Sequence, residues 1–97
     1  MYYRIVYMDY KVGDFIVTDK SEYPAIIIEK EGHRNLLVSI VEYNGDYIWL
    51  ETEEVEKAEL NEEEKLSILG KFGDWFYNVH TLIYQELIID ALNNILC

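Results

Sequence analysis

The residues best suited to acid–base or nucleophilic chemistry are few and scattered in this chain. Its two histidines are His33, in a predicted turn, and His80, in a predicted helix. Nucleophilic catalysis needs a nucleophile, a base and an orienting group together, and no serine or cysteine motif accompanies either histidine. Gly-x-Ser-x-Gly, P-loop and glycine-rich dinucleotide motifs do not occur. The sequence therefore predicts a protein that is not an enzyme, with a paired-carboxylate hydrolase as the alternative.

Metal and cofactor sites are not indicated either. Cys97 is the single cysteine, so it forms no internal disulfide, and with two distant histidines it cannot complete a four-ligand zinc site. The glutamate-rich segment lacks the Asp-x-Asp-x-Asp-Gly pattern of a calcium loop. No apolar run reaches the ~18 residues that cross a membrane, and the N-terminus has no hydrophobic leader. We expect no metal, no cofactor, no membrane, and a reducing, cytoplasmic setting.

Acidic side chains dominate the charge of the protein. The 97 residues include 19 Asp and Glu against 8 Lys and Arg, for a net charge of −11. Such a field repels nucleic acid and attracts basic surfaces, so it predicts a basic protein partner and no direct nucleic-acid binding. The alternative is a face that only keeps the protein in solution. The carboxylates are densest between residues 51 and 64, in an acidic strip made of Glu51, Glu53, Glu54, Glu56, Glu59, Glu62, Glu63 and Glu64.

Short β-type segments separated by turn residues fill the first sixty positions. Strands are predicted over residues 15–18, 25–28, 36–43 and 46–50, with a loose strand at 1–10, a tight turn at 51–54 and a short closing strand at 55–60. Asn44-Gly45 signals a two-residue hairpin turn, because both of its central positions need φ > 0. Residues 25–28 are continuously apolar, which predicts a strand covered on both faces.

The apolar spacing becomes helical after residue 60. Asn61 is expected to cap a helix and to form a capping box with Glu64, and Gly70 and Gly73 are expected to end or bend that helix. Asp74 is then expected to cap a second helix over 74–96.

The apolar arc of this second helix is too wide for one contact face. We therefore expect a homodimer, or a required partner, through it, the alternative being a monomer whose helix covers the sheet. The residues expected at such an interface are Trp75, Phe76, Val79 and Ile83.

Several short motifs, in order and spacing, resemble the Tudor branch of the SH3-like barrels. They are Lys11-Val12-Gly13-Asp14, then Tyr23-Pro24-Ala25 with Ile27, then Val38 and Ile40 followed by Tyr43-Asn44-Gly45-Asp46, then Trp49. The resemblance covers residues 11–58. It implies an SH3-like, Tudor-type five-stranded β-barrel, and together with the C-terminal α-helices expected from the apolar spacing this makes an α+β protein. We expect a single domain, with 1–60 as the barrel part and 61–97 as the helical part.

Tudor domains hold methylated lysine or arginine in an aromatic cage. The resemblance places Tyr23 and Tyr43 at two cage positions, but Lys20 or Asp19, and also Ile40, stand where the family has further aromatics. A lysine beside a cage would repel a cationic guest, so methyl-ligand binding is disfavoured. The aromatic surface candidates for protein binding are Tyr23, Tyr43, Tyr47 and Trp49.

Three functions fit these features. The first is an acidic inhibitor or decoy that occupies the nucleic-acid channel of a basic, nucleic-acid-handling protein. In size and charge the chain resembles phage-encoded anti-defence proteins, including anti-CRISPR proteins and DNA mimics, which implies the host-cell cytoplasm. The second is an SH3-like or Tudor-like protein-binding module, and the third is a protein that sequesters a small ligand. The charge favours the first.

Overall fold

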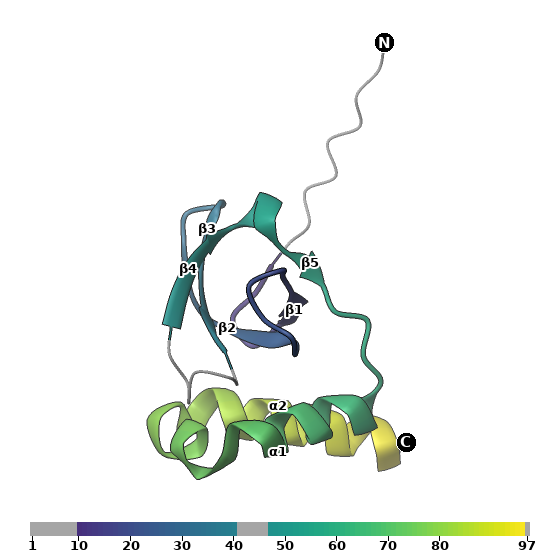
Figure 1. Ribbon diagram of the computed structural model, residues 1–97. Coiled ribbons are helices and arrows are strands. Elements are labelled where there is room, and N and C mark those ends of the chain that lie inside the picture. Colours follow the sequence, from purple (N-terminus) through teal and green to yellow (C-terminus); the bar gives the residue numbers. More distant parts are fainter. Residues whose placement is uncertain (1–9, 41–46, 97) are drawn as a thin grey trace.

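A computed structural model describes residues 10–40 and 47–96 as an α+β structure, with a five-stranded antiparallel sheet and two C-terminal helices. In Figure 1 the sheet curls above the helices, which pack against each other beneath it. The strands are β1 (Phe15–Val17), β2 (Ala25–Glu31), β3 (Asn35–Ser39), β4 (Tyr47–Glu51) and β5 (Glu56–Lys57). The helices are α1 (Glu62–Val79) and α2 (Thr81–Leu96).

The strand order is β4-β3-β2-β1-β5, with every neighbouring pair antiparallel. β4 and β5 are therefore the two edges of an open sheet, and no pairing between them closes it into a barrel within the described residues. A 3₁₀ turn, η2 (Thr52–Glu54), carries the chain from one edge strand to the other. This turn confirms the tight turn predicted at 51–54. An irregularity in β2 between Ile27 and Glu29 shifts its register against β3, and such bulges increase the bend of a sheet.

β2 lies between two cores. Ala25, Ile26 and Ile27 are all fully buried, which confirms that this strand is covered on both faces. Ile27 belongs to the core inside the curled sheet, together with residues such as Leu36 and Val38. Ile26 points the other way, into a second core between the sheet and the helices. The members that α1 gives to this second core are Ile68, Leu69, Phe72 and Phe76.

The start of α1 agrees with the prediction. Asn61 caps the helix, its side chain accepting a hydrogen bond from the Glu64 backbone N–H at 2.8 Å. The Glu64 carboxylate accepts in return from the Asn61 N–H at 3.1 Å, which completes the capping box. A backbone kink at Gly73 (φ 72°, ψ −166°) confirms the expected bend.

The helix predicted over 74–96 is not one continuous helix. Residues after Gly73 continue as the last part of α1, and the chain then breaks at His80 (φ −122°, ψ 51°) before α2 begins. The prediction failed because the apolar pattern runs through the break: His80 itself packs against Phe76, with ring centroids 5.0 Å apart. Other boundaries also differ. β2 extends to Glu31, and the closing strand is only two residues long. The 44–45 hairpin turn and residues 1–9 of the strand predicted over 1–10 lie outside the described residues.

The Gly73 kink can be tested by comparison with Gly70. An alanine side chain at either position would meet no atom within 4 Å, so steric clashes do not distinguish them. Gly73→Ala should lower the free energy of unfolding by about 1–3 kcal/mol, because its backbone conformation is costly for L-residues. Gly70→Ala should raise it by about 0.5–1 kcal/mol, because Gly70 has a helical backbone. Urea denaturation of both variants measures the difference, and equal effects would contradict the kink.

Candidate functional site

The acidic strip runs along one side of the molecule. In Figure 1 its segment leads from η2, past β5, and down to the start of α1. Seven of its eight glutamates are exposed, and Glu62 is half-buried. The structure therefore places the strip on the surface as one band of charge, although its members differ in what they contact.

At the η2 end, two glutamates hold the local backbone. The Arg34 guanidinium donates a hydrogen bond to Glu53 at 2.8 Å, which ties the β2–β3 turn to η2. This hydrogen bond from Arg34 lowers the pKa of Glu53 below its ordinary value. Glu54 accepts from the backbone N–H of Glu51 at 2.9 Å. The carboxylates of Glu53 and Glu54 therefore stabilise the local structure around η2 in the protein alone.

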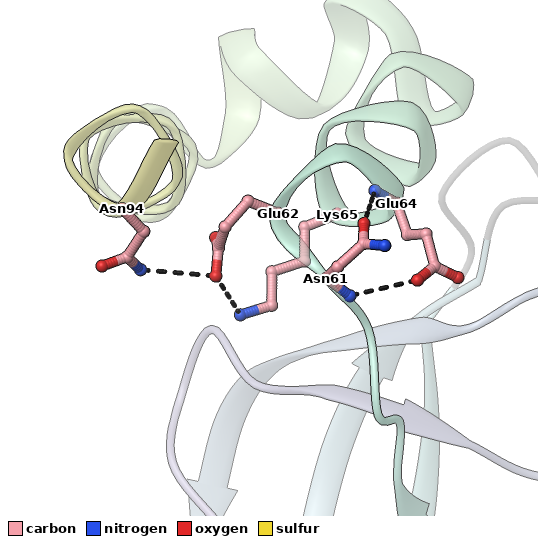
Figure 2. Close-up of polar contacts among 5 residues, drawn as sticks. All are labelled: Asn61, Glu62, Glu64, Lys65 and Asn94. Carbon is pink, nitrogen blue, oxygen red and sulfur yellow. Dashed lines mark hydrogen bonds and ion pairs between the residues drawn. The ribbon is translucent and has the colours of Figure 1, made fainter. Parts of the chain in front are cut away.

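At the α1 end, two more glutamates have local partners (Figure 2). Glu64 closes the capping box with Asn61. Glu62 accepts from Lys65 Nζ at 3.4 Å and from Asn94 Nδ2 at 3.3 Å, which links the start of α1 to the far end of α2. The carboxylates of Glu56, Glu59 and Glu63, by contrast, form no hydrogen bond or ion pair within the described part of the chain. These residues lie in β5, in the connection from β5 to α1, and in the first turn of α1.

An open groove of about 540 Å³ lies between the β1–β2 loop and the η2–β5 segment. Val17 and Val55 give it an apolar component, and Lys20 lies 3.9 Å from Asp19. The carboxylates that line it are Asp19, Glu53, Glu54 and Glu56. Sequence reasoning missed this groove, because Asp19 is more than thirty residues away from the strip and only the folded sheet brings the two together.

The single lysine of the strip segment is turned to other partners. Lys57 Nζ lies 3.6 Å from Asp14 and 5.7 Å from the centroid of the Tyr10 ring. Its charge is therefore held at the β1–β5 side.

Three of the four aromatic candidates lie in the described residues, and they differ in their surroundings. Tyr23 packs against the helix-side core, and Lys71 Nζ lies 4.8 Å from its ring centroid. The cation beside Tyr23 is thus already supplied by the protein. Tyr47 and Trp49 are 45% and 50% exposed on edge strand β4, and Tyr43 lies outside the described residues.

The residues expected at an oligomer interface do not form one surface. Phe76 is fully buried, and Trp75 and Ile83 are half-buried against the same helix-side core, so these three stabilise the fold. Val79 alone is well exposed, at 61%. The exposed apolar side chains of α2 lie elsewhere, at Leu82, Ile89 and Leu92. Sequence reasoning had included them in the same wide arc, because only the break at His80 separates the two parts.

Other types of site were sought in residues 10–40 and 47–96. No group of three or more His, Cys, Asp or Glu side chains there is arranged to hold a metal ion. Neither described helix is long and apolar enough to cross a membrane. His33 lies exposed in the β2–β3 turn, far along the chain from His80.

Comparison with protein families, with curated proteins and with solved structures gave no match. Function must therefore be inferred from the charges, contacts and exposed surfaces of this chain.

His80 joins the helix break to the sheet. Its Nε2 is 2.8 Å from the Tyr47 hydroxyl, and its ring packs edge-on to Trp75, with centroids 6.4 Å apart. Burial lowers the pKa of His80 below its ordinary value, since the surrounding rings solvate the charged form poorly. The hydrogen bond to Tyr47 can exist in either protonation state, so the penalty on protonation comes from burial.

This histidine should make stability depend on pH. A group whose pKa is lower in the folded state binds its proton more readily when unfolded, so its contribution is complete above the unfolded value of about 6.5. That contribution should fall as the pH drops from 6.5 towards the lower, folded pKa. Thermal unfolding between pH 7.5 and 5 should show a smaller fall in Tm for His80→Gln than for the wild type, with His33→Gln as the matched control. An identical fall in all three proteins would contradict this role.

Proposed function

We propose that this protein is an acidic, non-enzymatic interaction protein that inhibits a basic, nucleic-acid-handling protein by occupying its nucleic-acid site. The observation that supports this most directly is the open groove, where carboxylates from two separate segments converge, with Asp19 paired to Lys20 and Glu53 to Arg34. Phosphate-binding channels are lined by lysine and arginine. A surface that presents fixed carboxylates in place of phosphates is complementary to such a channel.

The strip is suited to steering a partner more than to holding it. Exposed ion pairs contribute only about 0–1 kcal/mol each. Many like charges on one side nevertheless raise the rate of association with a basic protein, and this effect weakens with salt. An inhibitor that competes with nucleic acid for the same channel gains from such fast association.

The proposal also includes the type of barrel to which the sheet belongs. We favour an SH3-like, Tudor-type barrel for the sheet, since η2 starts at edge strand β4 and leads within a few residues to edge strand β5. A small barrel closes where two edges approach each other in this way. A phage origin and a place in the cytoplasm of the host cell fit this proposal, and both rest on size and charge.

The structure directs the test to the glutamates without a local partner. A triple variant with Gln at Glu56, Glu59 and Glu63 removes three charges and leaves the hydrogen bonds of Glu53, Glu54, Glu62 and Glu64 intact. It should keep the wild-type Tm. Immobilised wild-type protein should capture a basic, nucleic-acid-binding protein from a bacterial lysate, and the variant should capture several-fold less through slower association at low salt.

The matched control removes the same number of charges from another part of the molecule. Asp74→Asn, Glu86→Gln and Asp90→Asn change exposed side chains on the helices. This triple should capture the partner as the wild type does. Equal loss in both triples would show that only net charge matters, and capture that depends neither on the strip nor on salt would contradict the proposed function.

A further inference from the structure

Trp49 shares its sheet face with several glutamates, and Arg34, in the turn between β2 and β3, is paired with Glu53. Residues paired across neighbouring strands share a face. Leu37 pairs with Glu29 on one side and with Trp49 on the other, so these three form one row across β2, β3 and β4. The apolar members of the row are Leu37, half-buried, and Trp49, half-exposed at 50%.

The next row along the same face adds two more carboxylates. Asn35 pairs with both Glu31 and Glu51, and it lies two residues before Leu37, which puts it on the same side of β3. Glu29, Glu31 and Glu51 are all exposed. Neighbouring strands are about 4.8 Å apart and alternate residues about 6.7 Å, so Glu51 is the near neighbour of Trp49, while Glu29 and Glu31 lie two strands away across the same face. Neither of these two rows contains lysine or arginine.

We propose that this face, with Trp49 on its edge strand β4, binds an arginine side chain of a basic partner. A guanidinium group is planar, stacks on aromatic faces, and forms paired hydrogen bonds with carboxylates at its edges. Tryptophan and arginine are also the residues that most often dominate binding energy at protein interfaces. An exposed tryptophan with Glu51 beside it, and with Glu29 in the same row beyond Leu37, matches that chemistry.

The charges on the face argue against other occupants. Nucleic acid would bring phosphates against Glu29, Glu31 and Glu51. A second copy of this chain, paired about a two-fold axis, would bring the same three carboxylates against themselves. The inference rests on the proposed function only for the sign of the partner's charge, because Trp49, Glu29 and Glu31 lie outside the acidic strip and only Glu51 belongs to both.

Two short peptides serve as probes, acetyl-Gly-Arg-Gly-Arg-Gly-amide and its lysine counterpart, titrated into ¹⁵N-labelled full-length protein. The indole N–H signal of Trp49 should shift and saturate as the arginine peptide is added. The protein should bind the lysine peptide more weakly. Trp49→Thr leaves the net charge unchanged and suits a strand. It should weaken arginine-peptide binding by about two- to fivefold, as expected for an exposed cation–π contact. Trp49→Phe should restore part of the loss.

The control is Tyr77→Thr, which removes an aromatic ring that is 43% exposed on α1, and it should bind the peptide as the wild type does. Equal binding of both peptides, wild-type affinity in Trp49→Thr, or an indole shift that depends on protein concentration alone would overturn the inference. The strip triple variant separates the two proposals. It should retain the Trp49 shift even if capture of the partner is lost, and a normal Trp49 shift with unaffected capture would refute only the strip.

Discussion

The arrangement of this protein depends on the burial of β2 on both faces. Successive side chains of a strand point to opposite faces, so a strand that is apolar at Ala25, Ile26 and Ile27 needs a core on each side. Burying each isoleucine contributes about 1.5–3 kcal/mol relative to exposure. By curling, the sheet can cover one of these faces with its own side chains, but the other face needs a separate layer. The helices supply that layer through Phe72 and Phe76, and they are thus part of the core.

The same strand also determines where the core ends. After the irregularity between Ile27 and Glu29, the sequence of β2 changes from apolar to Glu29-Lys30-Glu31, and the strand leaves the helical cover. Glu29 and Glu31 are exposed on the outer face, while Lys30 turns to the other side and donates to the Tyr10 carbonyl at 2.9 Å. The register of β2 against β3 and β4 then brings these two carboxylates into the rows of Trp49 and Glu51. The last part of β2, beyond its buried residues, therefore contributes two carboxylates to the exposed face that carries Trp49.

Features determined by local chemistry could be predicted from the sequence, and those determined by pairing could not. The Asn61–Glu64 capping box, the bend at Gly73 and the double-sided burial of residues 25–27 each follow from a few neighbouring residues. The outer face around Trp49 depends on strand register, where a shift of one residue moves every side chain to the opposite face, and β2 contains such a shift. The groove likewise requires Asp19 to meet Glu53 and Glu56 across the sheet. The break at His80 was missed because apolar spacing continues on both sides of it.

The charges of the acidic strip differ in how far they act. A carboxylate that caps a helix or turn, as Glu54 and Glu64 do, keeps its full negative charge, because backbone N–H groups are neutral. The carboxylate of Glu53 is instead largely balanced by Arg34, as that of Asp19 is by Lys20. The groove therefore keeps Glu54 and Glu56 as its unbalanced charges, and in salt their field extends only about 8–10 Å. Charge of this kind brings a basic partner close and orients it, but it gives little affinity by itself. Tight binding would need desolvated apolar contact as well, and on the sheet the exposed indole of Trp49 offers such contact beside the charges.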